Sequence, residues 1–162
     1  LAVDDWELLM RQEIKREYIR EYMLGKGGRA QMTQADWGSI GGMLKEQYTY
    51  LDAFADQVAT GKMSEGAIRA RSRMYIRSAR EAYERGNARA QSDGTLELPA
   101  YPGDGQTVCL TNCNCNWRIE AVTDEAGNVI GWDCFWEMNP NVENCPDCQD
   151  NKSAWWPLSV RI

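Results

Sequence analysis

The feature that most constrains this 162-residue chain is its cysteine distribution, because all six cysteines lie after residue 108. The first group is Cys109, Cys113 and Cys115, and the second is the Cys-x-x-Cys pair Cys145 and Cys148. Cys134 stands alone between the groups, and we expect it to be an ordinary buried thiol. Thiol groups before and after a hairpin can close one tetrahedral metal site, which is the layout of a zinc ribbon. The end of the chain is therefore predicted to fold around its cysteines.

The content of charged residues and of tryptophan changes at the same place, near residue 94. Residues 1–94 hold 15 Lys/Arg against 14 Asp/Glu, whereas residues 95–162 hold 3 against 10. Five of the seven tryptophans also lie in the second part. A chain of this length can bury one core, or a larger and a smaller one. We predict a helical module at residues 1–94 and a cysteine-rich module at residues 95–162.

The first module is predicted to begin with an amphipathic helix of roughly 20 residues. Asp4 and Glu7 have the spacing of a capping box, and apolar residues recur every three to four positions from Trp6 onward. Glycines at residues 25–28 are expected to end this helix.

Two further helices are predicted, and short connections favour antiparallel packing of the three. Thr33 with Asp36 starts the second, which runs to Thr60-Gly61. Ser64 starts the third, which ends at Gly86 and then residues 92–94.

Three glycines, at positions 38, 41 and 42, fall inside the second helix, where each costs about 1 kcal/mol relative to Ala. They suggest close approach by another helix, either of this chain or of another chain. A helix that starts at Gly42 is the alternative.

The second module is predicted to contain a β-hairpin. Residues 117–122 alternate in polarity as a half-buried strand does, residues 124–128 have turn composition, and residues 129–138 return as a second strand. The expected fold class is α+β, with an antiparallel three-helix module followed by a small zinc-ribbon-like hairpin module.

We expect a structural Zn²⁺ bound by four of the five clustered cysteines, because four thiolates satisfy tetrahedral zinc and a small module benefits from a metal. The sequence does not choose the four. Three disulfides would staple the same hairpin and remain the alternative. A redox role for Cys145-Pro-Asp-Cys148 is less favoured, since no βαβ pattern surrounds it.

The chain contains no histidine, which excludes Ser-His-Asp and Cys-His nucleophile pairs and imidazole acid–base catalysis. No Gly-rich phosphate loop or paired-carboxylate motif stands in for it, so we expect no enzyme and no small-molecule substrate. Nor does any stretch approach the roughly 18 to 20 apolar residues of a membrane span, and no signal peptide is evident, so we expect no membrane insertion.

The third predicted helix is rich in arginine. Its arginines are Arg69, Arg71, Arg73, Arg77, Arg80, Arg85 and Arg89. Guanidinium groups pair with phosphates and carboxylates, so Arg69, Arg73, Arg77 and Arg80 are candidates for binding DNA or an acidic partner. A solvated face with internal pairs, such as Glu81 with Arg77 or Arg85, is an equally weighted alternative, and the acidic second module competes as a partner. Trp155 and Trp156 either anchor a partner or seal the hairpin.

Several segments together resemble the C-terminal part of tailed-phage minor head, or head morphogenesis, proteins. The most specific are Leu98-Pro-Ala-Tyr-Pro-Gly-Asp-Gly105 and Cys109-Leu-Thr-Asn-Cys-Asn-Cys-Asn-Trp117, and the others are residues 74–83, 145–148 and 156–158. The resemblance covers the last half of the chain well and the helical half loosely. The chain departs from the family at Asn114, where a basic residue is common.

The resemblance implies a non-catalytic virion component that acts in capsid or portal assembly or in genome delivery. Its partners would be the portal protein, the major capsid protein or both, in a homo- or hetero-oligomer, after assembly in the host bacterial cytoplasm. Cys109, Cys113, Cys115, Cys145 and Cys148 would be the family's cysteines. A zinc-ribbon module that binds nucleic acid through the arginine-rich helix is the alternative function.

Overall fold

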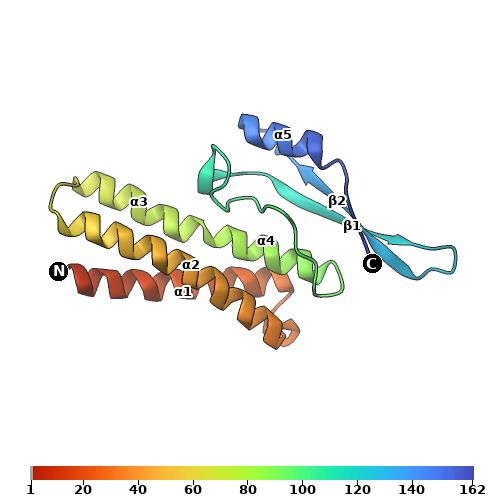
Figure 1. Cartoon of the computed structure of the whole chain (residues 1–162), viewed down its shortest axis with the longest axis horizontal. Coiled ribbons are helices and arrows are strands. Elements are labelled where there is room, and N and C mark those ends of the chain that lie inside the picture. The colour runs from red at the N-terminus through yellow and green to blue at the C-terminus, as the bar shows by residue number, and fades with distance from the viewer. Residues whose placement is uncertain (1) are drawn as a thin grey trace.

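The computed structural model describes residues 2–162 and shows an α+β chain, in which a small antiparallel sheet lies beside one end of a helical bundle (Figure 1). The helices are α1 (Val3–Lys26), α2 (Gln34–Ala59), α3 (Glu65–Arg77), α4 (Ala79–Ala90) and α5 (Pro146–Ala154). The strands are β1 (Asn116–Thr123), β2 (Val129–Glu137) and β3 (Leu158–Arg161), and two short 3-10 turns are η1 (Arg29–Gln31) and η2 (Leu110–Asn112). The predicted fold class is confirmed.

Local capping chemistry sets the starts of α2 and α3 and the end of α1. The helix start predicted at Thr33 and Asp36 is confirmed, where the two residues form a capping box, and the Ser64 side chain accepts a hydrogen bond from the backbone N–H of Ala67 at the start of α3. The predicted capping box at Asp4 is wrong, because α1 already begins at Val3, with Ala2 at its N-cap. Gly27 ends α1 in the left-handed conformation, with φ of 99°.

The third predicted helix is two helices, which is a correction to the sequence analysis. Residue Ser78 separates α3 from α4. Its hydroxyl donates to the carbonyl oxygen of Tyr75 at 2.7 Å and lies 2.7 Å from the hydroxyl of Tyr18 on α1. A serine that hydrogen-bonds to the preceding turn weakens the helical ladder and bends the helix. The two pieces follow each other along the bundle, antiparallel to α2 (Figure 1).

Two glycines that were expected to end helices instead lie inside them. Gly25 belongs to α1 and Gly86 to α4, and both are buried where these helices cross. Gly38, Gly41 and Gly42 behave differently, since α2 is continuous through them and a Cβ on any of the three would meet nothing within 4 Å. Within residues 2–162, then, no helix packs in close contact with those three glycines, and a start of α2 at Gly42 is wrong.

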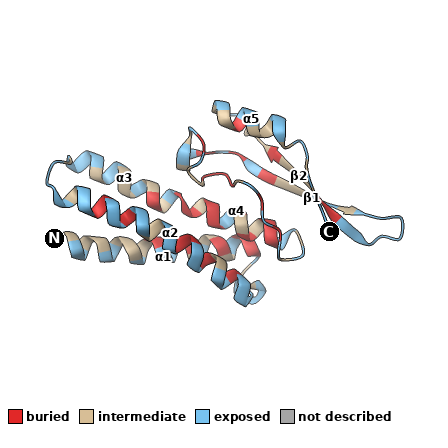
Figure 2. Ribbon diagram, viewed as in Figure 1, coloured by how far each residue is buried: buried red, intermediate tan, exposed pale blue. Residues whose placement is uncertain are grey.

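The bundle has its own apolar core, and the buried faces of its helices point toward each other (Figure 2). Its fully buried side chains are Ile14, Tyr18, Tyr22, Leu51, Phe54 and Ala82. A second core lies between the sheet, the cysteines and the end of α4. Ala88 of α4 belongs to this second core, so the two cores meet near the predicted division, and the boundary at residue 94 stays a prediction.

The sheet has the order β1-β2-β3, with Trp117 paired to Trp136 and Ala121 paired to Trp132. The predicted hairpin is confirmed, with its turn held by the carboxylate of Asp124, which accepts hydrogen bonds from the backbone N–H groups of Ala126 and Asn128. Strand β3 and helix α5 were not predicted. In the described part of the chain, none of the helices has both the length and the apolar character that a bilayer crossing requires.

Candidate metal centre

Helix α5 presents the second pair of cysteines. Cys145 is its N-cap, Pro146 follows in the first turn, and the sulfur of Cys145 accepts a hydrogen bond from the backbone N–H of Cys148 at 3.4 Å. Proline suits this position because the first N–H groups of a helix have no partner within it. The two thiols therefore lie at the positive end of α5, where the helix dipole favours thiolates.

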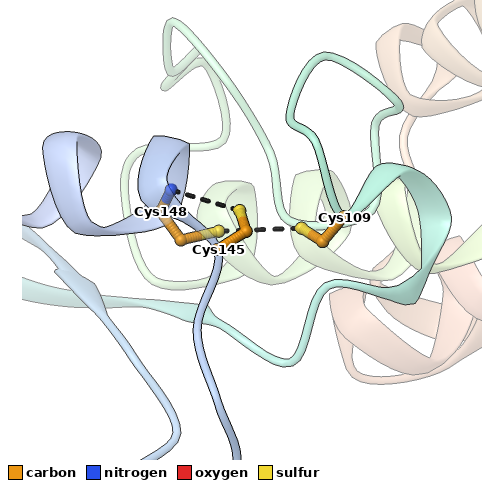
Figure 3. A group of neighbouring side chains, drawn as sticks. All are labelled: Cys109, Cys145 and Cys148. Carbon is orange, nitrogen blue, oxygen red and sulfur yellow. Dashed lines mark hydrogen bonds between the residues drawn. The ribbon is translucent and has the colours of Figure 1, made fainter.

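The first group of cysteines approaches from the loop that contains η2 and leads into β1. The sulfur of Cys148 lies 3.7 Å from that of Cys109 and 3.6 Å from that of Cys113. Cys109, Cys145 and Cys148 form one set of thiols with sulfurs within 4.8 Å of one another, and Cys113, Cys115 and Cys148 form another. Figure 3 shows the first set, in which Cys148 of α5 and the N-cap residue Cys145 face Cys109 of the loop. All five predicted ligands thus converge, with Cys148 common to both sets.

The interior of this cluster disfavours negative charge. Contact with the sulfur of Cys115 and burial raise the pKa of the Cys113 thiol, and burial is the main cause that raises the pKa of Cys148. Burial also acts to raise the pKa of Cys145, but hydrogen bonds led by the N–H of Cys148 outweigh it and lower that pKa. A bound cation supplies the positive charge that lets such neighbouring thiols ionise together.

Sulfur spacing fits a metal site better than disulfides. Four thiolates at about 2.3 Å from a tetrahedral ion lie about 3.8 Å from one another. The sulfur–sulfur separations of 3.7 and 3.6 Å are close to this value, whereas a disulfide requires about 2.05 Å. All six cysteines are free thiols in this structure. The clustered cysteines could therefore hold a metal ion, and more thiols are present than a tetrahedral ion uses.

Cys134 lies outside this cluster, as expected. It is fully buried in β2, and burial, with a smaller contribution from Asp133, raises its pKa to about 11.

Arginines of the bundle hold the cysteine loop. The guanidinium of Arg80 donates to the carbonyl oxygens of Cys113 and Cys115, and it also reaches Glu84 at 3.5 Å. Arg77 donates to the side-chain oxygen of Asn112 at 2.7 Å. These contacts attach the candidate metal centre to α3 and α4.

The other candidate arginines face solvent. Arg69 is exposed and pairs with Glu65, and Arg73 is exposed. The internal pair expected for Glu81 is formed with Arg85 at 3.0 Å. The arginine-rich segment therefore does two things: part of it binds the second module of the same chain, and part of it is open to solvent.

The two candidate tryptophans have different surroundings. Trp155 packs its ring 5.4 Å from that of Trp117 and 5.8 Å from that of Trp136, so it seals the second core. Trp156 is 47% exposed, and its ring contacts Phe135 of β2 and lies beside two cations, Arg118 of β1 and Lys152 of α5.

Two supporting residues escaped the sequence analysis. Asp147 accepts a hydrogen bond from the backbone N–H of Val108 at 2.7 Å and so joins α5 to the first cysteine loop. The hydroxyl of Thr107 lies 2.9 Å from the sulfur of Cys109. The Pro-Asp after Cys145 is a helix-start signal that could have revealed α5 and the place of Asp147.

Comparison of the chain with protein-family models, curated proteins and solved structures finds no significant match.

Proposed function

We propose that the cysteine cluster is a structural zinc site and that the chain is a non-catalytic structural protein of a tailed-phage head. The observation that carries the proposal is the convergence of four other thiols on Cys148, three of them in a loop that α4 holds through Arg80. Among biological cations, zinc combines a preference for thiolates with tetrahedral coordination. An all-thiolate site with four protein ligands stabilises a fold and leaves no open position for a substrate.

Such a site suits a protein that must keep one shape between larger subunits. The metal would fix α5 to the first cysteine loop, and the arginines fix that loop to the bundle. The proposed partners are the portal protein, the major capsid protein or both, with the chain inside the virion after assembly in the bacterial cytoplasm. The resemblance of residues 98–105, 109–117 and 145–148 to minor head proteins supports this role. Contact with DNA is compatible with it.

The zinc part of the proposal is tested by native and denaturing intact mass, together with elemental analysis. We expect one zinc per chain that is lost on denaturation, and no mass loss from disulfide formation. A metal-free native chain, or three disulfides, would overturn it.

The virion part is tested on purified particles from cells that produce this chain. Quantitative mass spectrometry should find its peptides at a fixed ratio to the portal protein through successive purification steps. Peptides that disappear as the particles become pure would contradict a structural role in the head.

Nucleic-acid binding is a second candidate, favoured by the exposure of Arg69 and Arg73. It has less support, because Arg77 and Arg80 are occupied within the chain. Its test is affinity for duplex DNA between about 50 and about 200 mM salt, where a protein that makes several phosphate contacts loses affinity steeply. No binding, or binding indifferent to salt, would reject it.

A further inference from the structure

A groove separates the bundle from the loop that follows α4. Its first part is a cavity of about 380 Å³ between α2, α3 and residues 104–111. Its second part is a cavity of about 200 Å³ between α2, α4 and residues 98–106. The two parts are contiguous, because they share the wall residues Gln47, Tyr50, Asp104 and Gln106. No cysteine lines either part, so the groove is separate from the candidate metal centre.

The first part offers apolar contact surface and a hydroxyl without a partner. Ala53, Met74 and Tyr75 line it, with Tyr75 only 7% exposed and Tyr50 half exposed at its border. Arg71 also lines this part, and its guanidinium donates to the side-chain oxygen of Gln57 and lies over the ring of Phe54. The side-chain oxygen of Thr111 is buried here and has no hydrogen-bond partner within residues 2–162. A buried hydroxyl without a partner is destabilising, and a hydrogen bond to a bound polar group would relieve this.

The second part carries more negative charge than the chain neutralises. Its carboxylates are Glu46, Glu81 and Asp104, and its cation is Arg85, which pairs with Glu81. Glu46 accepts a hydrogen bond from the hydroxyl of Tyr50 at 3.0 Å, and Asp104 accepts from the backbone N–H of Gln106 at 2.9 Å. Within the described residues neither Glu46 nor Asp104 has a cationic partner. Burial raises the pKa of Glu81; Arg85 opposes this, and Asp104 and Glu46 add to it.

We propose that this groove binds an extended segment of a partner polypeptide, with an apolar side chain against Met74 and Tyr75 and a lysine or arginine beside Glu46 and Asp104. The unneutralised carboxylates select a basic group. The amides of Gln47 and Gln106 stand between the two parts, and a primary amide both donates and accepts as a peptide backbone requires. Side chains two residues apart in an extended segment lie on the same face, so both can enter one groove. This inference goes beyond the proposed function, and none of the candidate metal ligands takes part in it.

The test is an NMR titration of the full chain, as purified, with two synthetic heptapeptides. One is acetyl-Gly-Ser-Lys-Ser-Leu-Ser-Gly-amide, and the other carries glutamate in place of lysine. We expect the lysine peptide, at millimolar concentration, to shift the side-chain amides of Gln47 and Gln106 and the backbone amide of Thr111. The glutamate peptide should leave them unchanged. Equal shifts with both peptides, or shifts only outside these residues, would overturn the proposal.

A pair of variants tests whether the carboxylate of Glu46 binds the lysine of the peptide. Glu46→Gln removes one unneutralised carboxylate and should weaken the lysine peptide about threefold, the size of one exposed charge pair. Asp56→Asn is the matched control, because Asp56 is exposed on the same helix and does not line the groove. An equal effect of both substitutions would mean that net charge, not the groove, governs the binding. A lysine peptide with serine in place of leucine should also bind more weakly; if it binds equally well, the apolar part is not used.

Discussion

Gly25 of α1 and Gly86 of α4 lie against each other's helix backbone. A Cβ on Gly25 would collide with the carbonyl oxygen of Tyr83, and a Cβ on Gly86 would collide with the carbonyl oxygen of Tyr22. Each glycine costs its helix about 1 kcal/mol relative to alanine, and close packing of the two backbones offsets that cost. The crossing brings the end of α1 next to α4 and hence next to the segment that leads to the second module.

Gly86→Ala is therefore expected to lower the free energy of unfolding by at least about 1–3 kcal/mol, because the new methyl group has no space and one helix must move. Gly42→Ala is the control, since it adds the same group to an open helix face and should stabilise by about 0.5–1 kcal/mol. Urea unfolding followed by circular dichroism measures both. If both substitutions change the free energy of unfolding in the same direction, the proposed backbone contact is wrong.

The place of Cys148 in both thiol sets leads to a prediction about metal content. Cys148→Ser should abolish stoichiometric metal binding, because each set loses its common member. Cys134→Ala should keep one metal per chain, although the smaller side chain leaves a cavity in the second core. Elemental analysis of the native proteins makes the measurement. Retention of metal by the Cys148 variant would place the site on the remaining four thiols of the cluster.

Most of the helical module could be predicted because its signals are local. The hydroxyl caps Thr33 and Ser64 act within three residues, so sequence spacing reveals them. Gly25 and Gly86 were misassigned because glycine serves both helix ends and close helix contacts, and only the partner helix decides between these uses. At the break between α3 and α4, the Ser78 hydroxyl also contacts the hydroxyl of Tyr18, which lies 60 positions away in the sequence. Nothing near Ser78 in the sequence reports that contact.

The ligands of the candidate site could be predicted from the sequence, but the elements and side chains that hold them in place could not. The spacing of the cysteines around a hairpin predicts that they cluster, because few other arrangements use cysteine in that pattern. Helix α5 lacks an apolar stripe, since Cys148 is its one buried residue, so hydrophobic periodicity could not reveal it. From the sequence, Arg80 is a candidate for binding DNA or an acidic partner. Its contacts with the carbonyls of Cys113 and Cys115 arise only when the two modules pack together.

Arg80→Ala should loosen the cysteine loop and leave Glu84 buried without its cation. Burial raises the pKa of Glu84, and Arg80 opposes that rise, so the variant should raise the pKa of Glu84 further. We expect faster hydrogen exchange in residues 107–116 and faster transfer of the metal to a chelator. Arg73→Ala is the control, because Arg73 is exposed on the preceding helix. Unchanged exchange and transfer in the Arg80 variant would show that the metal alone orders the loop.

A buried charge network joins the ends of three bundle helices. Asp36, fully buried at the start of α2, pairs with Lys26 of α1 at 3.2 Å and accepts a hydrogen bond from the hydroxyl of Tyr22 at 2.7 Å. Arg89 of α4 donates to the same hydroxyl at 3.0 Å and pairs with Glu97 at 2.9 Å. Since Lys26 and Arg89 are also buried and Glu97 is exposed, removal of the one buried carboxylate of this network would leave two cations poorly compensated.

Asp36→Asn is expected to cost about 3 kcal/mol of stability at pH 7, with a pH dependence of definite sign. Burial acts to raise the pKa of Asp36, but hydrogen bonds from Tyr22 and Thr33 and the Lys26 ammonium hold it below its ordinary value. A carboxylate with a lowered folded-state pKa contributes its stability above the unfolded-state pKa of about 3.9 and loses it as the pH falls through the folded-state value. The difference in the free energy of unfolding between the variant and the unsubstituted chain should therefore become smaller below about pH 4.

Metal loss in acid affects both chains alike and cancels in this difference. The control Asp56→Asn, on the exposed face of α2, should show no such difference in stability. A difference that stays constant from pH 7 to pH 3 would mean that the shape of the Asp36 side chain, and not its charge, holds the three helices together.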